Sequence, residues 1–379
     1  MTDVAIAHWG ESVNGGGERV AWELARTFNA PLYVSVRNKA IEPDDVEVKQ
    51  LFDGLTERLG KRGGLSHMAA NQFGWEIAQP LRDYDVLISS GNEVLSYVPP
   101  TEQTWIHYVH HTSRNATDLL PTVYERKDGT IGKYKAHLER VIRKIERQIY
   151  TSYATKPDVL VANSEVVANR VASYWGRTDT EVIYPPVPVA DYGADAESTE
   201  DYYLVLSRLD WHKAIDDIIA EFANRDKTLV IAGSGSEREY LEKLATSNVQ
   251  FEGYVSEARK QGLLAGAKAV INNAYAEDFG LTTVEPLASG TPVIGVREGM
   301  TQHLIRDGIN GFVYDRGKLS AAIDRCESEG VIWSDRQIER FANQFSVQEF
   351  HDKFHLLVNE AMNDTEVSIS WDLEKYTHC

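Results

Sequence analysis

Short apolar runs that alternate with amphipathic stretches restrict the fold of this chain more than any other feature of its sequence. In the first half, each run is rich in β-branched residues and bounded by turn formers, which is typical of buried parallel strands. The predicted strands are Val4–Ala7, Leu32–Val36, Val86–Ser89, Thr104–Val109 and Val159–Ala162. Since helical patterns separate these runs, the first half is predicted to be a βα repeat around a parallel sheet.

A proline-rich segment, Tyr184–Pro188, then interrupts the alternation, because prolines exclude a helix and disfavour a central strand. The alternation restarts after it. The predicted elements are strands at Tyr202–Ser207, Thr228–Ala232, Val249–Tyr254, Lys268–Asn272, Pro292–Val296 and Gly311–Tyr314, and a last helix at Val347–Met362. We predict an α/β fold of two facing Rossmann-like domains, residues 1–187 and 188–355, with a cleft between them. Residues 356–379 form the helix end and a tail that can pack back on the first domain.

The composition of the 379 residues excludes several classes of protein. No run of about 18 apolar residues exists, so no membrane-spanning helix is predicted. The segment Met1–Ile6 leads into a strand pattern without the basic and apolar regions of a signal peptide, so a cytoplasmic location is expected. The two cysteines, Cys326 and Cys379, can build neither a disulfide framework nor a cysteine metal site.

The net charge of −18 bears on the partners of the chain. A nucleic acid would favour a basic face, so no nucleic-acid partner is expected. Excess surface carboxylate also keeps proteins soluble in high salt, where self-repulsion is screened. A salt-loving source and an ordinary acidic cytoplasmic protein are therefore two open interpretations.

A glycine-rich turn, Gly15-Gly16-Gly17, follows the first predicted strand and precedes a helical pattern over Val20–Phe28. Glycines let backbone N–H groups approach a ligand, and a helix N-terminus favours an anion such as a diphosphate. A tight turn with nothing bound explains the same residues equally well.

Two histidines and an arginine, His110, His111 and Arg114, lie just past the predicted strand Thr104–Val109. Open α/β sheets place their ligands at the carboxyl ends of strands. Histidine can bond a sugar hydroxyl, and arginine can bind a phosphate. A structural loop histidine remains the alternative.

Arg208 and Lys213 follow the first strand of the second half on one loop. A planar guanidinium and an ammonium both suit a diphosphate, whereas two solvated surface cations are the alternative. The turn Gly233-Ser234-Gly235 adds backbone at the same edge of the predicted sheet.

Two carboxylates, Glu277 and Glu285, follow the predicted strand Lys268–Asn272 and lead into a helix. Carboxylates accept hydrogen bonds from the hydroxyls of a hexose or a ribose. The spacing of Thr282 and Glu285 also fits a capping box, in which Glu285 only satisfies backbone N–H groups.

The segment Glu277–Gly280 with Val284-Glu285, followed by Ala288–Ile294, resembles the hallmark of glycosyltransferase family 4, whose members are retaining enzymes of the GT-B architecture. The resemblance covers most of residues 1–320 in the expected order, and this order makes it specific. The other matching segments are Gly16–Arg19, Tyr108–His110 (as in mannosyltransferase-like members), Ala162–Ser164, Val182–Val187, Arg208-Leu209 with Lys213, Val230–Gly233 with Gly235, and Val249–Gly253.

Transferred by position, the resemblance implies a role for each candidate. Arg208 and Lys213 would neutralise the departing nucleotide diphosphate. Glu277 would contact the donor hexose, and His110 would lie near the reacting sugar. The implied donor-binding residues are Gly16, Gly17, Gly233, Phe279, Gly280, Leu281 and, for the ribose, Glu285.

The chain departs from the family pattern at two places. Glu298–Gln302 stands where Gly-Gly-x-x-Glu is usual, and Trp211-His212 replaces Pro-Tyr before the lysine. Both departures put the identity of the donor in doubt more than the activity. His111 is an alternative to His110 as the family histidine.

The implied reaction transfers a hexose, such as mannose or glucose, from a nucleotide-diphosphate sugar to an acceptor hydroxyl. Two cations can stabilise the departing diphosphate, so neither a bound metal nor a cofactor is expected. The resemblance implies retention, and a same-face displacement is preferred because no carboxylate is an obvious covalent nucleophile. A GT-B-fold nucleotide-sugar epimerase and a non-catalytic sugar-nucleotide binding protein remain alternatives.

The acceptor is expected to be a carbohydrate or a lipid-linked molecule, and His111 and Arg114 are its candidate contacts. The helical pattern Lys133–Thr151 carries an apolar stripe and the basic residues Arg140, Arg143 and Lys144. Such a helix can touch anionic lipid at the membrane surface, in the synthesis of glycolipid, lipid-linked oligosaccharide or surface polysaccharide. A helix packed on the core with a solvated polar face is the alternative.

Overall fold

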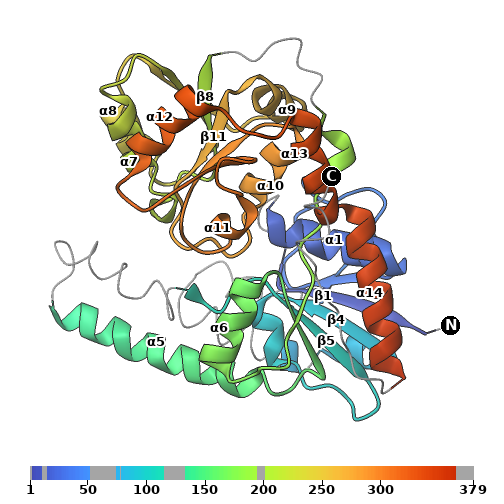
Figure 1. Cartoon of the computed structure of the whole chain (residues 1–379). Helices are drawn as coiled ribbons and strands as arrows, with labels where there is room; N and C mark the ends of the chain where they lie inside the picture. Colours follow the sequence, from blue (N-terminus) through green and yellow to red (C-terminus); the bar gives the residue numbers. More distant parts are fainter. Residues whose placement is uncertain are drawn as a thin grey trace. The chain divides into compact units, whose positions relative to one another are not determined.

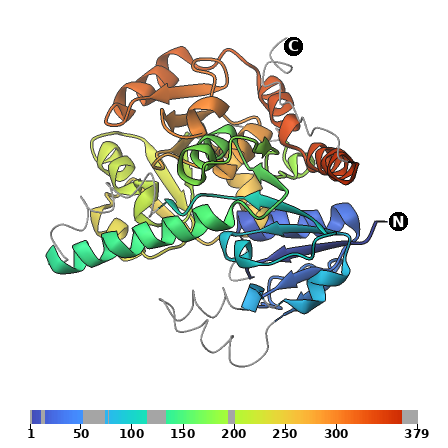
Figure 2. The same ribbon diagram turned by 90° about the horizontal axis from the view of Figure 1, so that it is seen from below.

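The chain forms two compact units in the computed structural model (Figures 1 and 2). The structure describes residues 2–10, 15–51, 74–76, 78–114, 133–193 and 201–363, and the side chains of residues 133–140 lie outside this description. The first unit comprises the described residues up to Pro186 and those from Phe350 onward. The second unit comprises the described residues of Val187–Glu349.

The first unit is built on a seven-stranded parallel sheet with the order β3-β2-β1-β4-β5-β6-β7. Its strands are β1 (Val4–His8), β2 (Leu32–Val34), β3 (Val48–Gln50), β4 (Val86–Ser90), β5 (Thr104–Val109), β6 (Val159–Ala162) and β7 (Glu181–Val182). All five predicted strands are confirmed. The two that the prediction missed, β3 and β7, are the edge strands. The helices are α1 (Gly16–Phe28), α5 (Lys133–Tyr153), α6 (Glu165–Trp175), the greater part of α14 (Val347–Met362), and the 3-10 turns η1 (Gln79–Asp83) and η2 (Asn92–Ser96).

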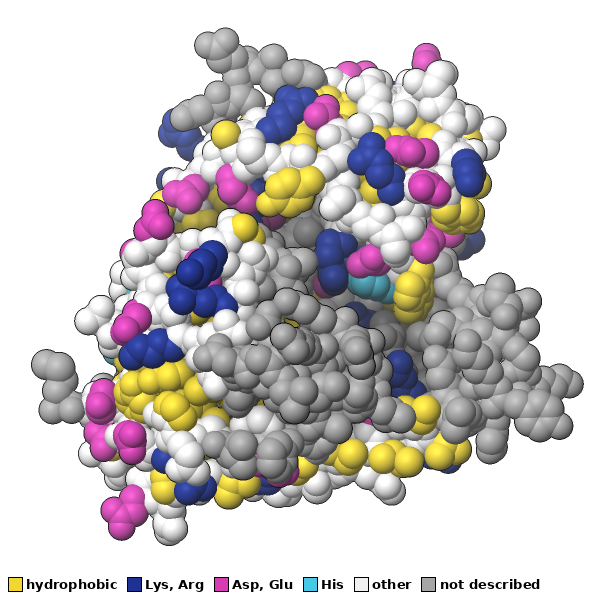
Figure 3. Space-filling view, turned by 180° about the vertical axis from the view of Figure 1, so that it is seen from behind, with side chains coloured by type: hydrophobic (Ala, Val, Ile, Leu, Met, Phe, Trp, Pro, Cys, Tyr) yellow, Lys and Arg dark blue, Asp and Glu magenta, His cyan; other side chains and the backbone are white. Residues whose placement is uncertain are grey.

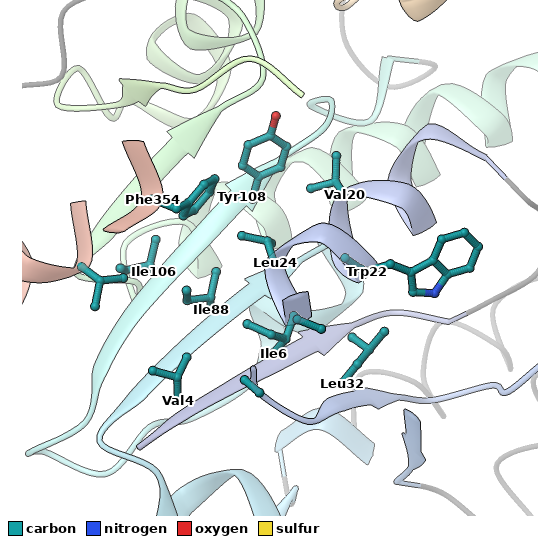
Figure 4. Close-up of a cluster of buried hydrophobic side chains, with 14 of the residues drawn as sticks. Val4, Ile6, Val20, Trp22, Leu24, Leu32, Ile88, Ile106, Tyr108 and Phe354 are labelled. Atoms are coloured by element: carbon teal, nitrogen blue, oxygen red, sulfur yellow. The ribbon is translucent and has the colours of Figure 1, made fainter. Parts of the chain in front are cut away.

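Helices cover both faces of this sheet. On one face, α1 and α14 pack against β1, β4 and β5, where Leu24 and Phe354 lie beside strand residues such as Ile88 (Figure 4). On the other face, α6 contributes Val167 and Val171 to a second apolar cluster. The chain returns to the first unit at Phe350, earlier than the predicted residue 356, because the buried rings of Phe350 and Phe354 pack 6.4 and 6.0 Å from the ring of Tyr108.

The second unit has a six-stranded parallel sheet with the order β10-β9-β8-β11-β12-β13. All six strands were predicted to within one residue at either end. They are β8 (Tyr202–Leu206), β9 (Thr228–Ala232), β10 (Val249–Gly253), β11 (Ala269–Asn272), β12 (Val293–Val296) and β13 (Gly311–Tyr314). The helices are α7 (Ile215–Phe222), α8 (Arg238–Leu244), α9 (Glu257–Gly266), α10 (Leu281–Ala288), α11 (Thr301–Leu304), α12 (Leu319–Glu329) and α13 (Asp335–Ala342), with 3-10 turns η4 (Val189–Asp191), η5 (Trp211–Lys213) and η6 (Asn343–Phe345).

The strand order reverses once in each sheet, between β1 and β4 in the first unit and between β8 and β11 in the second. In open parallel sheets, ligands bind at the carboxyl ends of the strands that flank such a reversal. The topology therefore directs attention to the residues that follow β1, β4, β8 and β11.

Two further features of the described residues are the distribution of charged side chains on the surface and the apolar character of the helices. On the face drawn in Figure 3, Lys and Arg side chains lie among Asp, Glu and apolar side chains, and the coloured residues form no continuous basic block. None of the helices in the described part of the chain combines the length and apolar character that crossing a membrane requires.

Candidate functional site

An ion pair stands at the point of strand reversal in the second unit. Lys213 ends η5 after β8, and Glu277 lies on the loop after β11. The Lys213 Nζ atom is 2.7 Å from Glu277 Oε2, and their side chains are only 12% and 16% exposed. The structure thus brings together two residues that the sequence placed at one sheet edge. Lys213 also borders a small pocket whose other polar lining residues are Ser207, Asn272, Asn273 and Thr282.

The residue before Lys213 adds no further cation. Burial and, to a smaller extent, the neighbouring Lys213 charge lower the pKa of His212 to about 4. His212 is therefore neutral at pH 7. The backbone of this turn is tied to the Glu277 loop, since the His212 carbonyl accepts a hydrogen bond from Tyr275 N–H at 2.9 Å.

The segment Glu298–Gln302, which departs from the family pattern, contacts the backbone of the loop that carries Glu277. Gly299 has φ +54°, and a Cβ added there would overlap the backbone of Ala276 and Glu277. Met300 N–H donates to the Glu277 carbonyl at 2.9 Å. Gly299 therefore allows a contact between two backbones that no larger residue permits.

Arg316, which the sequence analysis missed, supports the same loop through Glu298. Its guanidinium donates to both carboxylate oxygens of Glu298, at 2.6 and 2.9 Å. Glu298 Oε2 in turn accepts the N–H of Ala276 at 3.1 Å. The guanidinium also stacks 3.9 Å from the ring centroid of Tyr275. The only sequence signal was a lone arginine just past the last predicted strand.

Arg208 is not joined to Lys213 in this structure. Its side chain is 70% exposed, and Nη1 lies 3.6 Å from Asp210 Oδ2. Gly233, with φ +146°, has a packing role, because an added Cβ would overlap the carbonyl oxygen of Ser207. Their contacts with a donor stay predictions.

Glu285 does not cap a helix, so the capping-box hypothesis is wrong. The helix α10 begins at Leu281 with Gly280 as N-cap, and no side chain bonds the cap. Glu285 therefore lies in the second turn, where it is buried and accepts a hydrogen bond from Lys260 Nζ at 2.9 Å. Burial lowers the pKa of Lys260, but Glu285, Tyr192 and Glu257 together outweigh burial and raise that pKa above its usual value.

The remaining donor candidates lie at the start of α10. The Phe279 side chain is buried and its ring packs 5.6 Å from the ring of Phe345. Gly280, with φ +92°, gives the Glu277 side chain room, because an added Cβ would meet Glu277 Cγ at 3.1 Å. The N–H groups of Leu281 and its neighbour belong to the first turn, where helices leave donors unpaired.

In the first unit, His110 joins a buried cluster at the strand reversal. Its Nε2 lies 3.1 Å from Ser90 Oγ, which is 2.7 Å from His8 Nδ1. Gly16 and Gly17 are the first two residues of α1, and an added Cβ on Gly17 would meet the rings of His8 and His110 at 3.6 to 3.9 Å. The sequence analysis missed His8 and Ser90, although each directly follows a predicted strand.

The other first-unit candidates differ from His110. His111 is exposed, and its Nδ1 accepts the N–H of Ser113 at 3.1 Å, which favours His110 as the family histidine. Arg114 is half-buried at the end of a described segment.

The described basic residues of α5 have different surroundings. Arg143 pairs with Glu146 at 2.7 Å, Lys144 is exposed, and the Arg140 side chain lies outside the described residues. Val141 and Ile145 of the predicted apolar stripe are 41% and 51% exposed.

Comparison with known families decides the identity. Residues 194–344, which include β8, Lys213, Glu277 and α10, match the family model described as glycosyl transferases group 1. This part of the chain is therefore a glycosyl transferases group 1 domain. The predicted family and enzyme class are thereby confirmed.

Relatives of this glycosyltransferase extend the match into the first unit. An uncharacterized glycosyltransferase of Methanocaldococcus jannaschii is 27% identical over 186 residues, which are 46% of this chain and 43% of that protein. The D-inositol 3-phosphate glycosyltransferase of Nocardioides sp. is 26% identical over 340 residues, 77% of this chain and 71% of the relative. The chain thus spans under half of the first relative and about 70% of the second.

A solved structure shares the fold. Anabaena HepE in complex with UDP and glucose superposes with a TM-score of 0.73 at 16% identity, covering 95% of this glycosyltransferase and all of HepE. Together with the two parallel sheets, this likeness confirms the predicted GT-B architecture.

Proposed function

We propose that the enzyme transfers a hexose from a nucleotide-diphosphate sugar to an acceptor hydroxyl. The observation that carries this proposal is the Lys213–Glu277 pair at the strand reversal of the second unit. An ammonium suits the donor diphosphate, and a carboxylate suits the hydroxyls of the hexose. The two groups stand 2.7 Å apart, so one bound sugar phosphate can engage both.

The chemistry follows from the charges. As the bond between the sugar and the diphosphate breaks, positive charge grows on the sugar and negative charge grows on the diphosphate. Lys213 and the exposed Arg208 stabilise the diphosphate, without a metal ion. We propose retention of configuration by same-face displacement, with a donor phosphate oxygen as the base for the acceptor hydroxyl. His110 lies near the transferred sugar and contacts it.

We propose that Glu285 receives the ribose of the donor. The Lys260 ammonium donates a hydrogen bond to one oxygen of the buried Glu285 carboxylate at 2.9 Å. An ionised carboxylate is the stronger acceptor for ribose hydroxyls.

Thermal-shift screening against UDP-, GDP- and ADP-sugars tests donor binding. A donor present at about 100 times its Kd should stabilise the native protein by about 2.7 kcal/mol. Arg208→Ala should abolish most of this stabilisation and leave the unliganded melting temperature unchanged, because the Arg208 side chain is 70% exposed. Arg336→Ala, a change of another exposed arginine on α13, is the matched control and should respond like the native protein. The proposal fails if no sugar nucleotide stabilises the enzyme.

We further propose peripheral contact of α5 with anionic lipid, which suits a lipid-linked acceptor. The exposed Val141 and Ile145 flank the exposed Lys144. The double variant Lys144→Glu/Ile145→Ser should lose binding to vesicles that contain anionic lipid, since each basic residue contributes about 1 kcal/mol near such a surface. Lys243→Glu, on the exposed face of α8, should bind as the native protein does. Absence of native binding at low salt would refute the membrane proposal and leave the transferase proposal intact.

A further inference from the structure

Three strand ends of the first unit bring two imidazoles onto one hydroxyl. His8 ends β1, Ser90 ends β4, and His110 follows β5 directly. Ser90 Oγ is 2.7 Å from His8 Nδ1 and 3.1 Å from His110 Nε2. A hydroxyl has one proton to donate, so it donates to one ring and accepts from the other. The protonation of the two rings is therefore coupled.

Both rings are neutral at pH 7. Burial lowers the pKa of His8 to about 4, and burial likewise holds the pKa of His110 well below its usual value. Each ring then carries one N–H, and two arrangements are possible. In the first, His8 Nδ1–H donates to Ser90, Ser90 donates to His110 Nε2, and His110 carries its proton on Nδ1. In the second, every bond is reversed, and His8 carries its proton on Nε2.

The second ring nitrogen of His8, Nε2, distinguishes the two proton arrangements. His8 Nε2 is fully buried and has no hydrogen-bond partner among the described residues. A buried N–H without an acceptor is rarer and more costly in proteins than an acceptor that lacks a donor. The first arrangement leaves only a bare lone pair at His8 Nε2, so it is the more stable of the two.

We propose that His8 and Ser90 are positioning residues that hold His110 in the Nδ1–H tautomer, so that this N–H donates a hydrogen bond to an oxygen of the bound sugar substrate. The inference rests on the proposed function, in which His110 contacts the transferred sugar. His110 Nδ1 bonds no other described residue in the structure, and His110 is half-buried. Gly17 leaves the adjacent ring edges uncovered by a side chain.

Imidazole ¹⁵N NMR of the full-length enzyme tests the tautomer directly. The expected spectrum of the native protein shows a protonated Nδ1 and an unprotonated Nε2 for His110. Ser90→Ala should remove this preference and lower kcat of transfer about tenfold, while thermal stabilisation by the donor found in the screen stays unchanged.

The matched control is Ser89→Ala. Ser89 is equally buried, but it bonds His107 and Trp105 instead, each at 2.7 Å. Loss of its hydroxyl should lower stability similarly and leave the His110 signals and kcat as in the native protein. A protonated Nε2 on native His110, or equal kcat in the two variants, overturns the inference. Correct tautomers without any donor binding would instead refute the proposed function alone.

Discussion

Replacement of Lys213 by methionine should lower kcat of sugar transfer by about 10²- to 10³-fold. Methionine keeps most of the length and apolar volume of the side chain and removes the charge that faces Glu277 at 2.7 Å. An electrostatic contact to a leaving group stabilises the transition state more than the bound donor, so kcat should fall more than donor affinity. Initial rates with the donor identified by thermal shift measure the effect.

Two further variants make this result specific. Glu277→Gln keeps the shape of the side chain and removes its charge, and the double variant with Lys213→Met should be little worse than the poorer single variant, because the two residues act as a unit. Lys243→Met removes an exposed lysine of α8 and should transfer sugar at the native rate. A Lys213→Met enzyme with native kcat would falsify the role of this ammonium.

Gly299→Ala should cost about 10²-fold in turnover, although Gly299 is not expected to touch the substrate. The added Cβ would overlap the backbone of Ala276 and Glu277, so the Glu277 loop has to move. A displacement of about 1 Å in a positioned group can reduce a rate by about 10²-fold. Steady-state kinetics, with circular dichroism to verify the fold, measure this change.

Backbone conformation alone also destabilises the variant, by about 1 to 2 kcal/mol for alanine in the left-handed region. Gly176→Ala isolates that contribution, because Gly176 lies in the left-handed region with φ +78° and ψ 11° and has no atom within 4 Å of an added Cβ. We expect Gly176→Ala to melt earlier and to keep native turnover. Similar turnover in both alanine variants would show that the contact between Gly299 and the Glu277 backbone does not position the site.

The fold was predictable wherever burial on both faces makes a strand continuously apolar. Strands such as β6 and β9 match their predicted bounds because every interior position is hydrophobic. The missed strands β3 and β7 are short and contain Lys49, Gln50 and Glu181, which edge positions tolerate. Such residues give no periodic signal, and only pairing with a neighbouring strand defines them.

The sequence predicted the sheet edge at which each candidate residue lies, but it did not predict the contacts between these residues. Lys213 and Glu277 were placed at one edge by the order of the strands, yet their ion pair depends on loop conformations that spacing does not encode. Lys260 was missed because a lysine between the polar residues Arg259 and Gln261 suggests a solvated helix face, whereas packing buries Lys260 against Glu285. The capping-box hypothesis failed for a local reason, since Gly280 starts α10 two residues before Thr282.

The last helix has a consequence for how the protein is synthesised. Phe350, Phe354, Leu357 and Val358 of α14 belong to the core of the first unit, although the ribosome makes them after the whole of the second. Domains commonly fold in order of synthesis, N-terminal first. Here the described part of the second unit, which lies between the two parts of the first in the sequence, can fold first, while one face of the earlier sheet waits until α14 has been made. A nascent chain stalled near residue 345 would therefore contain a folded second unit and an incompletely folded first unit that precedes it in the sequence.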